Sequence, residues 1–300
     1  MKAIEDRGAI ETAKRVRQRI SAAFVCAIAK GIADIDPAEG LGAALKPLRK
    51  GRQPAIVDLV RLRTMIDDAE RDHARPITRL ALRLLALTSV RPSEIRGAQW
   101  TEFEDLDGRA PLWRIPATRM KGDLDRKEEV GGDHLVPLAP QSVALFRALW
   151  PLTGSCSLLF PNERHWHRPM SENAIGYLLN RAGYHGHHVP HGFRAAFSTI
   201  MNEWVEQHGK DHDRKVIDLM LAHVPSGKVE SVHNRAAYMP RRREIARIWA
   251  DKLTEGLPPP AEIVGRVARE SKSGLRRKPL PEVPASFRFP IVPRSVPALR

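Results

Sequence analysis

The segment that most restricts the fold is an apolar helix pattern that ends at an arginine and a proline. Residues 76–89 read PITRLALRLLALTS and are dominated by leucine, isoleucine and alanine. A helix that is apolar on nearly all sides is expected to be buried. Arg91 precedes Pro92 and is expected to emerge where the buried helix ends. It is either a surface arginine stabilised by the helix dipole or part of a polar site.

Most of the remaining chain carries helical periodicity, and one stretch does not. Residues 110–121 and 133–140 read as two strands separated by a polar connection that contains glycine. Residues 91–100 read as a turn with Ser93 as a candidate helix N-cap, and residues 156–161 as a short strand or turn. Helices are predicted over residues 5–31, 58–72, 76–89, 139–150, 171–183, 191–205, 214–224 and 242–253. The predicted fold class is mainly α with a small β-hairpin or sheet (α+β).

The charge of the chain restricts its partners. A net charge of +14 and an isoelectric point near 10.3 favour a polyanion, nucleic acid first and an anionic membrane second. No run of about 18 apolar residues occurs, which argues against a transmembrane helix, and the N-terminus lacks the apolar centre of a signal peptide. The two cysteines, Cys26 and Cys156, have no metal or redox spacing. These features predict a reduced, cytoplasmic protein.

Two stretches differ in composition from the rest. Residues 40–57 look like a linker rich in glycine and proline, which either crosses a duplex backbone or is a solvated loop. Its basic residues are Lys46, Arg49, Lys50 and Arg52. Residues 256–300 hold nine of the 24 prolines and show no hydrophobic periodicity, so they are predicted to be a disordered or extended basic tail.

Four further residues along the chain are candidates for an anion site. Lys121 ends the first predicted strand, either as a solvated lysine or as a cation reaching into a groove. His191 and Arg194 are three residues apart at a helix start, hence on one face, where an anion is favoured. The alternative is a capping histidine and a surface arginine. His223 follows an apolar helix and either caps it or donates to a phosphate oxygen.

Each candidate is weak alone, but their order is specific. Arg91, Lys121, His191, Arg194 and His223, followed by a tyrosine, resemble the catalytic set of the tyrosine recombinase (phage integrase) family. The stretches LALTSVRPSEIRGAQW, HGFRAAFST, LAHV and RRREIARIWADKL look like prophage and genomic-island integrases. The resemblance covers about residues 1–253. It implies a partial helical core-binding domain at 1–45, a basic linker at 46–57, a recombinase catalytic domain at 58–254 and a Pro/Arg-rich tail at 255–300.

The resemblance also implies a reaction. Arg91 and Arg194 would clamp the non-bridging oxygens of a DNA phosphodiester, and His191 and His223 would add hydrogen bonds or assist proton transfer. Lys121 would protonate the leaving 5′-oxygen. A tyrosine hydroxyl would attack, giving a covalent 3′-phosphotyrosine, so that neither a metal nor another cofactor is needed. The implied partners are double-stranded attachment sites and a homo-tetramer on DNA, in the bacterial nucleoid rather than at a membrane.

The sequence departs from the family at the nucleophile. His233 stands about ten residues after His223, where relatives carry the tyrosine, and Tyr238 comes five residues later. Five residues on a helix rotate a side chain by about 140°, so Tyr238 serves only if the segment is unwound or shifted. We predict that Tyr238 is structural and that the nucleophile is lost. The alternative function is then a catalytically dead duplex-binding remnant of an integrase.

A histidine-rich stretch invites a third reading as a metal-dependent hydrolase. It contains His185, His187, His188 and His191. No acidic or cysteine partner stands at useful spacing, whereas structural zinc needs a defined tetrahedral set. We therefore predict no metal site.

Overall fold

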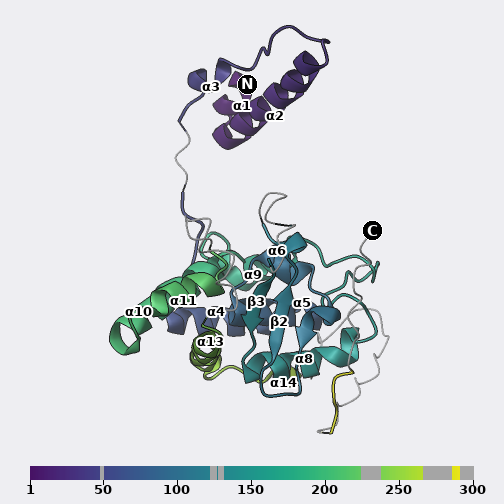
Figure 1. Cartoon of the computed structure of the whole chain (residues 1–300), viewed down its shortest axis with the longest axis vertical. Coiled ribbons are helices and arrows are strands. Elements are labelled where there is room, and N and C mark those ends of the chain that lie inside the picture. The colour runs from purple at the N-terminus through teal and green to yellow at the C-terminus, as the bar shows by residue number, and fades with distance from the viewer. Residues whose placement is uncertain (48–50, 122–126, 128–131, 224–237, 266–285, 291–300) are drawn as a thin grey trace. The chain divides into compact units, whose positions relative to one another are not determined.

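The computed structural model describes residues 1–47, 51–121, 127, 132–223, 238–265 and 286–290 (Figure 1). The chain divides into two compact units, Met1–Arg52 and Gln53–Arg300. The described elements are mostly helices together with one three-stranded antiparallel sheet, so the predicted fold class is confirmed. Among the described helices, none combines the length and the hydropathy that a bilayer crossing requires.

The first unit contains three helices, α1 (Lys2–Asp6), α2 (Ile10–Ala29) and α3 (Leu41–Ala44). The single helix predicted over residues 5–31 is therefore wrong at its start. Gly8 has a φ of 80°, which lies outside helical geometry and separates α1 from α2. Helix α3 likewise lies inside the stretch predicted to be a linker.

The second unit is built around α5 (Pro76–Thr88), which the apolar pattern predicted to be a buried helix. Its residues 79–87 are all buried, and it contacts α4 (Leu59–Arg71), α8 (Pro140–Thr153), α9 (Ala174–Leu179), α13 (Met239–Thr254) and α14 (Pro260–Gly265). A buried ion pair lies within this core. Arg83 of α5 donates through Nε to Glu70 of α4 at 2.6 Å, which pairs both buried charges. Helix α5 ends at Ser89, in the left-handed conformation with φ 51°.

The sheet has the order β1 (Phe103–Glu104), β2 (Leu112–Ile115) and β3 (His134–Pro137), each pair antiparallel. In Figure 1, β2 and β3 lie side by side, and Ile115 pairs with His134. Both strands are shorter than predicted. Proline cannot donate to a ladder, and Pro116 ends β2 before the 3₁₀-helix η2 (Ala117–Arg119). Strand β1 was not predicted, because two residues carry no alternation pattern.

The candidate residues lie in or next to α6 (Pro92–Arg96), α10 (Gly192–His208) and α11 (Asp213–Met220). Ser93 is not the N-cap of α6; Arg91 is. Proline is favoured at the first helical position, and the helix starts at Pro92, two residues earlier than Ser93 as N-cap would give. Two short helical turns lie beside these helices in the chain. One is η1 (Trp100–Glu102), between α6 and β1, and the other is η3 (Asn180–Tyr184), between α9 and α10. Residues 156–161 form only isolated bridges, at Leu158 and Pro161.

The C-terminal stretch is more ordered than predicted in two places. Residues 260–265 form α14, with Ile263 and Val264 buried, so an extended chain is wrong there. Six residues are too few to show periodicity. Further on, Phe287 and Phe289 pack their rings against Trp150, with centroids 5.8 and 5.7 Å away.

Candidate functional site

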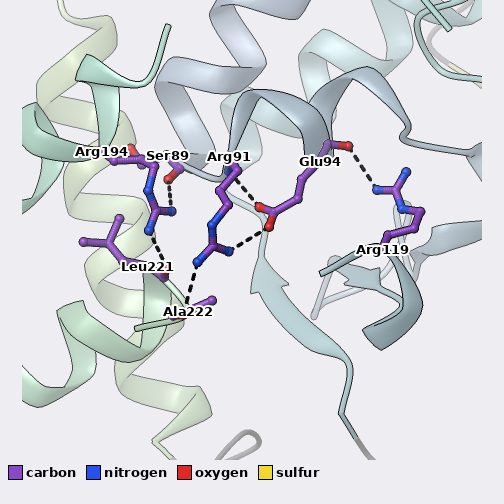
Figure 2. Close-up of polar contacts among 7 residues, drawn as sticks. All are labelled: Ser89, Arg91, Glu94, Arg119, Arg194, Leu221 and Ala222. Atoms are coloured by element: carbon purple, nitrogen blue, oxygen red, sulfur yellow. Dashed lines mark hydrogen bonds and ion pairs between the residues drawn. The ribbon is translucent and has the colours of Figure 1, made fainter. Parts of the chain in front are cut away.

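Arg91 stands at the junction of α5 and α6, held by the helix it begins (Figure 2). Its backbone N–H donates to Glu94 Oε2 at 2.7 Å, and its Nη1 donates to Glu94 Oε1 at 2.9 Å. The Glu94 side chain is 1% exposed and that of Arg91 is 16% exposed. One buried carboxylate therefore fixes both the backbone and the guanidinium of Arg91, leaving the side chain partly open to solvent.

Arg194 comes from the first turn of α10 and is almost completely buried. Its Nη1 donates to the carbonyl of Ser89 at 3.1 Å, and its Nη2 donates to the carbonyl of Leu221 at 2.6 Å. Burial and the neighbouring charge of Arg91 lower the pKa of Arg194 to about 10, while Glu94 opposes this shift. Arg194 therefore remains a cation at neutral pH.

The turn that follows α11 brings the two arginines together. Leu221 accepts from Arg194, and the next carbonyl, of Ala222, lies 3.5 Å from Nη2 of Arg91. Ala222 has a φ of 50°, an uncommon left-handed conformation for a residue with a side chain. Figure 2 shows both guanidinium groups directed at this turn. The carbonyls of residues 221 and 222, hereafter the carbonyl turn, thus hold two cations from segments about 100 residues apart in sequence.

The other cationic candidates face the same region. Burial lowers the pKa of His191, and the charges of Arg194, Arg91 and Lys121, with His223, lower it further. A charge acts in this way only over a short distance, so these four groups lie near enough to His191 to disfavour its protonated form. His191 and Lys121 are exposed. His223 is exposed too, and its Nδ1 lies 3.1 Å from Asp218 Oδ1.

Tyr238 lies elsewhere. Its ring stacks on His212, with centroids 5.4 Å apart and planes 24° apart, and its backbone is left-handed with a φ of 58°. His212 precedes α11 whereas His223 follows it, and an eight-residue helix is about 12 Å long. The structure therefore places Tyr238 at the end of α11 opposite the carbonyl turn. His233 lies outside the described residues.

The start of α13 is anchored at that same opposite end. Arg241 donates through Nε to the buried Asp213 at 2.8 Å, and Arg242 donates through Nη2 to the carbonyl of Leu135 on β3. The hydrogen bond from Arg241 lowers the pKa of Asp213. These contacts connect the helix after Tyr238 to the sheet and to α11.

Sequence reasoning missed two residues next to the arginines. Glu94 was not singled out, although a carboxylate three residues after Arg91 was a visible capping signal. His134 on β3 is buried. Its pKa is held well below the usual value by burial and then by Arg242, Arg91 and Arg194, so it is neutral. Nothing in the sequence distinguished His134 from the other eleven histidines.

The remaining predicted residues are dispersed. His188 is buried, and its Nδ1 accepts the backbone N–H of Ile56 at 3.0 Å. Within the described part of the chain, no group of three or more histidine, cysteine, aspartate or glutamate residues is arranged to hold a metal ion. Lys46 and Arg52 of the basic linker are exposed. Arg49 and Lys50 lie outside the described residues.

Comparison with known proteins identifies the family of the chain. Residues 58–235, more than half of the chain, match the phage integrase family, and residues 1–44 match the phage integrase central domain. This chain belongs to the phage integrase family.

Its relatives within the family are longer. Prophage integrase IntA of Escherichia coli (strain K12) is 32% identical over 83% of this integrase-family chain and 56% of its own length. The integrase of Shigella phage Sf6 is 34% identical over 84% of this chain and 61% of its own length. The chain thus spans between 56% and 61% of these two proteins.

Solved structures share the fold. A lambda integrase dimer bound to a core site matches with a TM-score of 0.51 and 17% identity, over 75% of this chain and 76% of that one. The Tn1549 transposon integrase in complex with a circular intermediate DNA matches with a TM-score of 0.51 and 14% identity, over 82% of each chain. At these identities the likeness shows a common fold.

Proposed function

We propose that this chain is the DNA-processing part of a site-specific DNA recombinase of the integrase type, which holds one phosphodiester of duplex DNA between Arg91 and Arg194. The observation that carries the proposal is the carbonyl turn, to which both guanidinium groups donate. Preorganised cations stabilise the charge that develops on phosphate oxygens without reorganising during the reaction. The described bonds use two of the five N–H donors of Arg194, so donors remain for a phosphate.

The neighbouring residues supply the rest of the chemistry. His191 has a lowered pKa and is neutral at pH 7, so one ring nitrogen donates to a phosphate oxygen and the other accepts. His223 adds a second hydrogen bond. In strand cleavage the attacking hydroxyl passes its proton to the unprotonated ring nitrogen of His191 and its oxygen bonds to phosphorus. The bond from phosphorus to the 5′-oxygen breaks, and Lys121 gives that oxygen a proton. The phosphotyrosine retains the bond energy, so the exchange needs no metal or other cofactor.

A second candidate function is DNA binding without cleavage, which the position of Tyr238 favours. The ring of Tyr238 contacts His212 instead of the cationic residues. Cleavage through Tyr238 requires the ring to leave His212. His233 occupies the position expected for the nucleophile and has no hydroxyl group. In this function Arg91 and Arg194 bind the phosphate, and no DNA strand is cleaved.

The proposal extends to the whole chain and its partners. We propose that residues 1–45 contribute part of a core-binding domain, residues 46–57 a basic linker along the duplex, and residues 58–254 the catalytic domain. A lambda integrase tetramer bound to a Holliday junction matches this chain with a TM-score of 0.51. By analogy, we propose assembly as a homo-tetramer on double-stranded attachment sites, associated with the bacterial nucleoid.

Measurements of duplex DNA binding test whether Arg91 and Arg194 hold a phosphate. Arg194→Met is expected to weaken duplex binding roughly eightfold at 0.1 M salt and to lower the slope of log affinity against log salt by about 0.9, since one phosphate contact is lost. Arg214→Met is the matched control, because Arg214 also lies near a helix start but is exposed and paired with Glu206 at 2.6 Å. If Arg194→Met and Arg214→Met lose the same DNA-binding affinity, the proposal that Arg91 and Arg194 hold a phosphate is wrong.

Cleavage is tested separately. The chain is incubated with a nicked suicide attachment site of a relative and separated on a denaturing gel. A covalent band that disappears in Tyr238→Phe assigns the hydroxyl to Tyr238. No band, with salt-dependent binding retained, supports the binding-only function. A band gained in His233→Tyr shows that the remaining residues still catalyse the reaction.

A further inference from the structure

Arg119 connects the segment that carries Lys121 to the helix that begins at Arg91. It is the last residue of η2, two residues before Lys121. Its Nη2 donates to the carbonyl of Glu94 at 3.0 Å, and the carboxylate of the same Glu94 holds Arg91. Figure 2 shows Arg119 and Arg91 on opposite sides of Glu94. Glu94 of α6 thus accepts hydrogen bonds from both Arg91 and Arg119.

A second anchor holds Arg119 to the sheet. Its Nη2 lies 3.3 Å from Oε2 of Glu102, and that same oxygen accepts the indole N–H of Trp113 on β2 at 2.9 Å. Glu102 and Trp113 are both buried. Burial raises the pKa of Glu102, whereas the charge of Arg119 and the bond from Trp113 lower it. The guanidinium of Arg119 is therefore fixed between the sheet and α6.

Stability alone does not explain a guanidinium at this position. The Nε and Nη1 atoms of Arg119 are buried and have no hydrogen-bond partner in the described part of the chain. An unsatisfied buried donor costs about 1–3 kcal/mol. An apolar side chain of similar length paired with a neutral residue 102 would avoid that penalty. Arg119 is better explained by its contacts with Glu94 and Glu102, through which it holds α6 and the sheet at a fixed separation.

We propose that Arg119 is a positioning residue that sets the place of Lys121 relative to the Arg91 clamp. Two residues of chain span at most about 7 Å, and the intervening Met120 is itself buried. The anchor on Glu94 therefore restricts where the backbone of Lys121 stands. The inference rests on the proposed function, in which Lys121 and Arg91 act on one phosphodiester.

A double-mutant cycle on binding to nicked duplex DNA tests this role. At 0.1 M salt, Lys121→Ala is expected to weaken binding roughly eightfold in the otherwise unchanged chain, as one phosphate contact is lost. In an Arg119→Met background the same substitution should weaken binding less than twofold, because Lys121 is already displaced. A residue that only stabilises the fold leaves the Lys121→Ala effect unchanged.

Arg114→Met is the matched control background. Arg114 lies on β2 and donates to Glu104 of β1 at 2.7 Å, so it is also an arginine paired with a carboxylate. Its described hydrogen bonds and ion pairs are to Glu104 and Asp133, and none is to α6. The Lys121→Ala effect should remain eightfold there. Smaller effects in both backgrounds would reflect general loosening of the sheet and would overturn the proposal.

Gly97 offers a second variant in case Arg119→Met does not fold. A Cβ on Gly97 would lie 2.7 Å from Nη1 of Arg119, so Gly97→Ala pushes the guanidinium aside while its charge stays. The φ of Gly97 is −95°, which alanine adopts freely. Gly97→Ala should reduce the Lys121→Ala effect as Arg119→Met does.

The outcomes separate the two proposals. If Lys121→Ala and Arg194→Met have no effect on binding by the unchanged chain, the proposed phosphate site is wrong and the positioning role falls with it. If both have their effects and Lys121→Ala still weakens binding eightfold beside Arg119→Met or Gly97→Ala, only the positioning role is wrong.

Discussion

Replacing His188 by asparagine is expected to remove a large part of the acid sensitivity of the second unit. His188 is 1% exposed, and its Nδ1 accepts the N–H of Ile56 at 3.0 Å. This bond requires a ring nitrogen without a proton. Ile56 lies near the end of the basic linker, so the bond fastens that end of the linker to the turn that precedes α10.

The magnitude follows from the pKa of the ring. Burial lowers the pKa of His188 from its ordinary value to about 4, against about 6.5 in an unfolded chain. Between these values the folded state binds fewer protons, so stability is complete above pH 6.5 and falls as the pH falls toward 4. From pH 7 to pH 5 the linkage amounts to about 2 kcal/mol, or roughly twentyfold in the unfolding equilibrium constant.

Urea unfolding followed by tryptophan fluorescence measures this difference. All six tryptophans lie between residues 100 and 249, so the signal reports only on the second unit. In His188→Asn the side-chain oxygen can replace Nδ1 as acceptor, and the residue does not titrate. Between pH 7 and pH 5 the variant should lose about 2 kcal/mol less than the unchanged chain does.

His165→Asn provides the control, because His165 is exposed and its replacement should leave the pH dependence as it is. The other histidines contribute equally to the unchanged chain and to His188→Asn, so they cancel in the comparison. The reasoning is refuted if the unchanged chain and His188→Asn lose the same stability between pH 7 and pH 5.

Two further substitutions test how the C-terminal half is held. Asp213→Asn should lower the free energy of unfolding by about 3 kcal/mol, since it leaves Arg241 without its buried partner. Urea unfolding at pH 7 measures this loss. Glu206→Gln, in an exposed ion pair, is the control and should change the free energy of unfolding by under about 1 kcal/mol. Because Arg241 lowers the pKa of Asp213, the pair stabilises fully above about pH 4 and less as the pH falls through the lowered pKa. Phe289→Ala should cost about 1 kcal/mol, since a half-buried ring leaves Trp150, and should speed cleavage of the C-terminal segment by trypsin; unchanged cleavage would contradict the packing of residues 286–290.

Much of the fold was predictable, because long apolar patterns depend little on context. The buried helix α5 was predicted within one residue, since a segment apolar on nearly all sides is stable only inside a domain. Short elements escaped prediction. Strand β1 and helix α14 contain two and six residues. Each is shorter than two periods of its own pattern, and its packing partners hold it in place. The helix break at Gly8 was likewise a backbone event that residue periodicity did not reveal.

The candidate site divides in the same way. The sequence by itself determined which cations occur and in what order, from Arg91 to His223, because side-chain identity needs no fold to be read. Only the tertiary structure decided how they are held, since the acceptors at Ser89, Leu221 and Ala222 are backbone carbonyls, which every residue possesses. The same holds for Tyr238, whose ring stacks on His212, a contact between segments 26 residues apart. The chemical groups available to a site follow directly from the residue types in the sequence, whereas the position of a guanidinium or a phenol depends on packing between distant segments.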